Sequence, residues 1–222
     1  MKKSLCLILI SISTLYVCGQ QVYIETGTAV SAFHYKNSDL EFLDNLFGSN
    51  NLFMQMGYHT VSKVNRMNYS AGISYIGYGA HGSDSTVGNY FDWDVRYIGV
   101  DLGLDYEIIK KRFTTSSLSE LTVYIKMTIS PEILVHGTQT INNEVYNLAG
   151  VEQFKYPFIF ARGGAGVSYS INRAVTVYAE YMGGEGFPIK TGDRDDKERL
   201  WIASHNIGFG LYVNLPAYKS WR

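Results

Sequence analysis

Cysteine is almost absent from this chain, since its 222 residues include only Cys6 and Cys18. A form of the protein without its first 19 residues would have none, which excludes a disulfide scaffold. Proline is also scarce, with 4 residues, whereas 18 tyrosines and 22 glycines favour aromatic-rich strands. A basic excess is lacking too, with 19 Lys and Arg against 20 Asp and Glu. The sequence therefore predicts no nucleic-acid partner.

A long apolar run is missing after the N-terminus, so the sequence predicts no membrane-spanning helix. The N-terminus itself has Lys2 and Lys3, an apolar run over residues 5–17 and a small residue at Gly19. This layout is typical of a secretory signal peptide. We predict that residues 1–19 are removed and that residues 20–222 form a single domain. A lipoprotein with Cys18 lipidated is an alternative that the bulky Val17 disfavours.

Alternation of apolar and polar residues recurs along the rest of the chain. In the stretch LTVYIKMTISPEI, residues 121–133, the aliphatic side chains share one face and Lys126 and Glu132 share the other. A soluble strand would turn the aliphatic face inward, whereas a membrane barrel would turn it toward lipid. Eight segments show the pattern: 22–34, 51–61, 66–79, 93–108, 121–135, 158–171, 174–184 and 201–214.

The connections between these segments alternate between long and shorter ones, as in bacterial outer-membrane barrels. The sequence thus predicts an all-β fold, an eight-stranded antiparallel up-and-down transmembrane β-barrel with its long loops outside. Arg162 shares a face with glycines and serines, which a packed soluble core would not contain. In so narrow a barrel the inward charges should form ion networks that leave no channel. The predicted lumen charges are Glu25, Asp101, Asp105, Glu107, Lys126, Glu132, Arg162 and Glu180.

The last strand, HNIGFGLYVNL, has the polar, glycine and spaced-apolar layout of a barrel's terminal signal. With the signal peptide and the strand pattern, it makes the chain resemble small outer-membrane β-barrel proteins of Bacteroidota, of the OmpA-barrel, OmpX-like and PorT-like kind. The resemblance implies location in the bacterial outer membrane and a structural, adhesion or secretion-accessory role. It implies as partners outer-membrane lipid, lipopolysaccharide and, during biogenesis, the barrel assembly machinery.

The first long connection contains FLDNLF, whose apolar residues have helix-like spacing. Packing of this loop on its own barrel is the favoured interpretation, and the candidate residues for an interaction loop that meets an envelope protein partner are Phe42, Leu43, Leu46 and Phe47. The mixed charges of DRDDKER, residues 193–199, indicate a solvated outer loop.

The sequence leaves two alternative functions open. One is an exported soluble or lipid-anchored barrel that binds an apolar ligand, as lipocalins do. The other is a lipid A-modifying barrel enzyme that would use Ser204 and His205, although neighbouring strand residues point to opposite faces. The scattered histidines share no ligand spacing. We therefore predict no catalytic residue, no cofactor and no metal site.

Overall fold

The computed structural model describes residues 20–36, 46–61, 66–83, 90–113, 119–151, 154, 156–189 and 199–215, with only the backbone described at 35, 36 and 199. The predicted signal peptide and the predicted loop residues Phe42 and Leu43 lie outside this part of the chain. Within it, no helix is long and apolar enough to cross a membrane.

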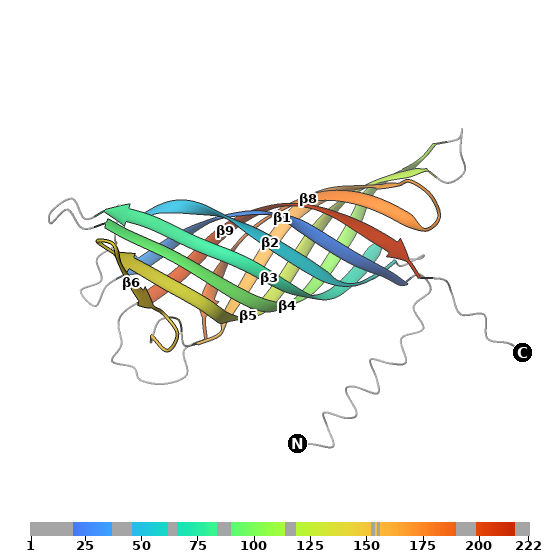
Figure 1. Ribbon diagram of the computed structural model, residues 1–222. Coiled ribbons are helices and arrows are strands. Elements are labelled where there is room, and N and C mark those ends of the chain that lie inside the picture. The colour runs from blue at the N-terminus through green and yellow to red at the C-terminus, as the bar shows by residue number, and fades with distance from the viewer. Residues whose placement is uncertain are drawn as a thin grey trace, which may run out of the picture.

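The described residues form one antiparallel sheet that closes into a barrel (Figure 1). The pairing of β9 with β1 and of β4 with β5 completes the ring, so the wall has no open edge along its length. The predicted eight-stranded up-and-down barrel is confirmed. The wall strands are β1 (Gln20–Lys36), β2 (Leu46–Thr60), β3 (Met67–Ser83), β4 (Tyr90–Arg112), β5 (Glu120–Ile141), β7 (Phe158–Ser170), β8 (Val175–Pro188) and β9 (Arg199–Asn214).

The two faces of the wall differ as a membrane-spanning barrel requires. On β5, Ile125, Met127 and Ile129 point outward and are 47%, 67% and 58% exposed. Lys126 and Glu132 point inward and are 3% and 0% exposed. This is the reverse of the arrangement that the soluble, lipocalin-like alternative needs. The other wall strands continue the outward apolar face, for example with Val100 and Leu102 on β4 and Phe209 on β9.

The inside of the barrel changes character along its axis. We call the end where β1 begins and β9 finishes the terminal end, and the opposite end the far end. Toward the far end the inward residues are apolar and aromatic, including Phe33, Phe158 and Phe160. Leu148 and Phe154, from the connection between β6 and β7, are buried in the same cluster. The prediction of a charge-filled lumen is therefore wrong for this end of the barrel.

Two strand boundaries differ most from the sequence prediction. Leu46 and Phe47 belong to β2 and not to a helix-like loop; Leu46 packs against the far-end apolar cluster, while Phe47 is exposed. The predicted long connection after residue 135 holds the rest of β5, a two-residue turn and β6 (Glu144–Asn147). Asn142 and Asn143 form that turn with φ of 48° and 71°, values that asparagine tolerates better than most residues.

Candidate functional site

The barrel lumen is the candidate site, because it gathers charged side chains from many strands. All eight predicted lumen charges are less than a tenth exposed. β1, β4, β5, β7 and β8 each contribute at least one of them, since every second residue of a strand faces inward. They form three groups, described here from the far end toward the terminal end; Asp101, which accepts a hydrogen bond from the hydroxyl of Ser130, belongs to the first.

Arg162 on β7 is at the centre of the first group. Its guanidinium donates to Glu132 Oε1 at 2.7 Å and to the hydroxyl of Tyr78. It also donates to Ser130 Oγ at 3.3 Å and lies over the ring of Phe160, with Cζ 4.4 Å from the ring centroid. Tyr78 in turn donates to Glu132 Oε2 at 2.7 Å. This buried ion pair is therefore surrounded by hydrogen bonds, the condition under which such a pair is tolerated.

Lys126 on β5 is at the centre of the second group. Its Nζ donates to Oε1 and Oε2 of Glu180 at 2.8 and 3.1 Å, and Tyr124 donates to Glu180 Oε2 at 3.0 Å. Glu180 is therefore the ion-pair partner of Lys126. Close by, Tyr178 donates to Glu25 Oε2 at 3.0 Å.

The third group, nearer the terminal end, includes a residue that the sequence analysis missed. His59 bridges Gln21 Oε1 at 2.9 Å and Asp105 Oδ2 at 2.8 Å, and its ring lies against Tyr212 with centroids 4.6 Å apart. Its inward position on β2 could have been found from alternation. The partnership with Asp105 could not, because it joins strands two places apart in the ring. Glu107 lies farther along β4 and pairs with Lys110 Nζ at 3.2 Å.

Small residues make room for these side chains. A Cβ at Gly166 would lie 2.4 Å from the ring of Tyr124, and one at Gly208 would lie 1.9 Å from Glu25 Oε1. The glycines of the inner face therefore allow tyrosines and carboxylates to cross the lumen.

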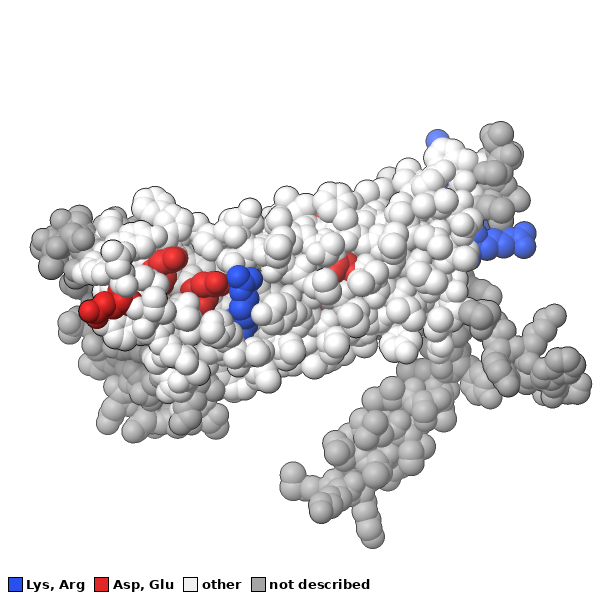
Figure 2. All heavy atoms as spheres, viewed as in Figure 1, with Lys and Arg blue, Asp and Glu red and all other residues white. Residues whose placement is uncertain are grey.

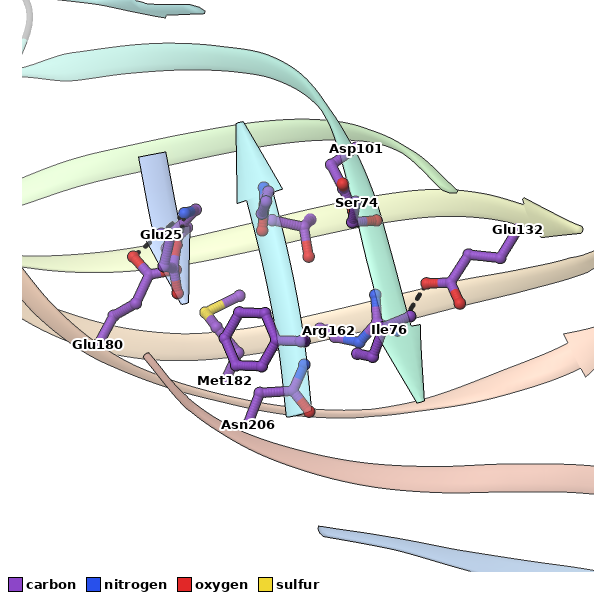
Figure 3. Close-up of a pocket in the computed structure, with 13 residues that line it drawn as sticks. Glu25, Ser74, Ile76, Asp101, Glu132, Arg162, Glu180, Met182 and Asn206 are labelled. Carbon is purple, nitrogen blue, oxygen red and sulfur yellow. Dashed lines mark hydrogen bonds and ion pairs between the residues drawn. The ribbon is translucent and has the colours of Figure 1, made fainter. Parts of the chain in front are cut away.

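A small cavity of about 30 Å³ lies between the first two groups (Figure 3). That volume is enough for roughly two water molecules, since one needs about 10–15 Å³ by this measure. The lumen is thus nearly filled at this level. The residues lining the cavity include Glu25, Ser74, Asp101, Lys126, Glu132, Arg162, Glu180 and Asn206.

The outer face carries few charges between the two ends of the barrel in the view of Figure 2. Asp94 and Arg96 on β4 are partly exposed and are 3.3 Å apart. Ser204 is fully buried inside the wall, whereas His205 is exposed outside and bonds to the hydroxyl of Tyr181 at 2.6 Å. Ser204 and His205 therefore do not form a nucleophile and base pair. Among the described residues, no three His, Cys, Asp or Glu side chains are grouped to hold a metal ion.

Solved structures similar to this chain include three bacterial surface and outer-membrane proteins. Neisserial surface protein A is 12% identical, over 87% of this chain and 97% of that one, with a TM-score of 0.41. Ail, the attachment invasion locus protein of Yersinia pestis, is 13% identical over 87% and 98%, with a TM-score of 0.34. The outer membrane protein OprG of Pseudomonas aeruginosa is 13% identical over 88% and 96%, with a TM-score of 0.43. No family model and no curated protein sequence matches the chain.

Proposed function

We propose that the protein is an integral barrel of the bacterial outer membrane, closed to solutes, with a structural, adhesion or secretion-accessory role and no catalytic one. The observation that carries the proposal is the division of side chains across the wall, with Met127 outside and Lys126 inside on the same strand. A surrounding lipid bilayer stabilises this arrangement, because the apolar outer face stays out of water and the charged inner face stays out of lipid.

Aromatic side chains on the outer face support this placement. Trp201 stacks on His34 with ring centroids 5.6 Å apart, and Phe47 stacks on His81 at 6.0 Å. Both pairs lie toward the far end, where an aromatic girdle would meet lipid headgroups. Lipopolysaccharide is the proposed lipid partner at that interface, and the assembly machinery is the proposed partner of β9 during biogenesis.

Membrane integration is tested by fractionating cells that express the full chain. We expect the protein to stay in the membrane pellet after carbonate and high-salt washes, and to run as a faster band in gels when it is not boiled. Release by these washes without detergent would overturn the proposal. A periplasmic soluble protein carried through the same washes serves as the control.

The closed lumen is tested by electrical recording in planar bilayers. Apolar packing around Leu148 and Phe154 fills the far end, and two buried ion pairs fill the middle. We therefore expect no stable conductance from the purified chain. A large and stable conductance would show that the lumen is open, with a porin in the same bilayers as the positive control.

An adhesion or secretion-accessory role requires a partner, and the far end offers exposed apolar side chains to meet one. Phe47 is 64% exposed and Val145 is 67% exposed. We expect an envelope protein to co-purify with the intact chain in detergent, and to be lost when residues 37–45 are deleted together with a Phe47→Ser change. A lipid-facing Met127→Ser variant is the matched control. Identical co-purifying proteins in all three samples would count against a partner at this end.

A further inference from the structure

The two ends of the barrel carry opposite charges (Figure 2). Toward the far end, the described charged side chains outside the lumen are mostly acidic, with Asp92, Asp94, Glu144 and Glu185 against Arg96. At the terminal end the described charges are mostly basic, with Arg66, Lys110, Lys111, Arg112 and Arg173 against Glu107 and Glu120. The charge of the barrel therefore changes sign along its axis.

Three of the bases at the terminal end are left without a carboxylate. Lys110 and Arg112 pair with the two acids of this end. Arg66, Lys111 and Arg173 are exposed and form no ion pair with any residue that the structure describes. Arg66 lies between β2 and β3, Lys111 lies near the end of β4, and Arg173 lies between β7 and β8. We call these three residues the cationic rim, since they follow the turns of the terminal end around the barrel.

Apolar side chains of the outer face lie beside the cationic rim. Lys111 shares a face of β4 with Ile109 and Phe113, which are 54% and 40% exposed. Its Nζ is 5.9 Å from the centroid of the Phe113 ring. Ile171, which is 51% exposed, lies two residues before Arg173. A base in such a place can lay its aliphatic stem along apolar surface and hold its charge at the level of the lipid headgroups.

Exposed tyrosines occur at the same end of the wall. Tyr58 on β2, Tyr69 on β3 and Tyr169 on β7 all lie near the ends of their strands on this side. In the register of the sheet, Lys111 pairs with Leu121, which pairs with Tyr169. Tyrosine is enriched where the apolar core of a membrane meets the headgroups. The cationic rim is therefore next to the membrane interface.

We propose that the cationic rim binds the phosphate group of an anionic glycerophospholipid, such as phosphatidylglycerol, in the leaflet at the terminal end. The inference rests on the proposed membrane location of the barrel and adds a lipid class to one of its ends. Arginine and lysine are the side chains that bind phosphate, and bases near an anionic membrane surface are attracted to it. An acidic soluble protein fits less well, because the three bases are spread around the rim beside lipid-facing side chains and are not gathered in one patch.

The test measures which lipids stay with the full chain after reconstitution in vesicles of phosphatidylcholine and phosphatidylglycerol and extraction in a mild detergent. We expect phosphatidylglycerol to be enriched several-fold over its share of the vesicles, and the enrichment to fall as salt is raised. Arg66→Asn with Lys111→Gln and Arg173→Gln should abolish the enrichment; asparagine is chosen because residue 66 has a φ of 54°. Two control variants should keep it. Arg66→Lys with Arg173→Lys retains both charges, and Arg96→Gln removes a base at the far end.

Equal retention of the two lipids by the unaltered chain would overturn the inference. Enrichment that persists in the triple variant would overturn it too, because the lipid would then be held elsewhere, and so would its loss in Arg96→Gln, because net charge alone would then explain it. If the triple variant does not fold, Lys111→Gln takes its place with an expected partial loss, and an unchanged enrichment there would refute the rim. Gel mobility of unboiled samples separates this inference from the proposed function. A chain that inserts into the vesicles without enriching phosphatidylglycerol refutes the inference alone, whereas a chain that does not insert refutes both.

Discussion

Replacing Arg162 with methionine tests how the buried ion pair stabilises the barrel. Methionine keeps most of the apolar contact with Phe160 but removes every hydrogen bond that the guanidinium donates. Glu132, which is 0% exposed, would keep only Tyr78 as a donor. Removing one partner of a buried pair costs about 3–5 kcal/mol, so we expect the free energy of unfolding to fall by that amount.

A second change separates loss of the pair from loss of packing. Arg162→Met with Glu132→Gln removes both charges of this ion pair. We expect this double variant to recover roughly half or more of the lost stability. Replacing both partners of a buried ion pair with neutral residues costs far less than leaving one charged partner buried and unpaired. Arg112→Met is the surface control; Arg112 is 81% exposed and pairs with Glu120 at 2.7 Å. Its cost should be much smaller than that of Arg162→Met.

The assay is urea unfolding of the barrel in lipid vesicles, followed by tryptophan fluorescence and by gel mobility without boiling. Each variant is titrated in both directions to establish equilibrium. If Arg162→Met costs no more than Arg112→Met, or if Glu132→Gln rescues nothing, the reasoning about the buried pair is refuted.

Three further predictions use the same titrations. Met127→Arg places a charge on the lipid-facing side and should cost about 2–4 kcal/mol if the residue lies near the membrane midplane, whereas an unchanged midpoint would contradict a lipid-facing wall. Gly166→Ala should destabilise the barrel because its Cβ would meet the Tyr124 ring at 2.4 Å, whereas Gly163→Ala, whose Cβ has no neighbour closer than 4.0 Å, should be nearly neutral; equal effects would refute the crowding argument. Partial burial of Glu120 opposes its ionisation, but hydrogen bonds from Arg112 and Lys110 on β4 hold the pKa of Glu120 below its ordinary value of 4.5. This contribution to the free energy of unfolding is present above pH 4.5 and is lost as the pH falls through the lower folded-state pKa. Glu120→Gln should therefore flatten the pH dependence of the free energy of unfolding in this range, and an unchanged pH dependence would contradict the prediction.

Alternation along the chain was enough to predict the wall, because the period of a strand assigns each residue to one face without knowledge of its neighbours. It failed where the period breaks. At Val135 the pairing of β4 with β5 shifts register, so Val135 and His136 are both exposed. Because alternation is interrupted there, the sequence pattern did not predict that β5 continues to Ile141. The helix-like spacing predicted for Leu46 and Phe47 was wrong for a related reason, because four apolar residues at mixed spacing fit a helix as well as the start of a strand.

The sequence by itself therefore determined the number of wall strands, their direction and which charges point inward. Only the tertiary structure decided which charges meet. Lys126 reaches Glu180 and Arg162 reaches Glu132 because closure of the ring sets how far neighbouring strands slide past one another. The same closure brings His59 to Asp105 and folds Leu148 and Phe154 into the far end. Local pattern specifies a face, but partners across a lumen depend on distances that no short stretch of sequence contains.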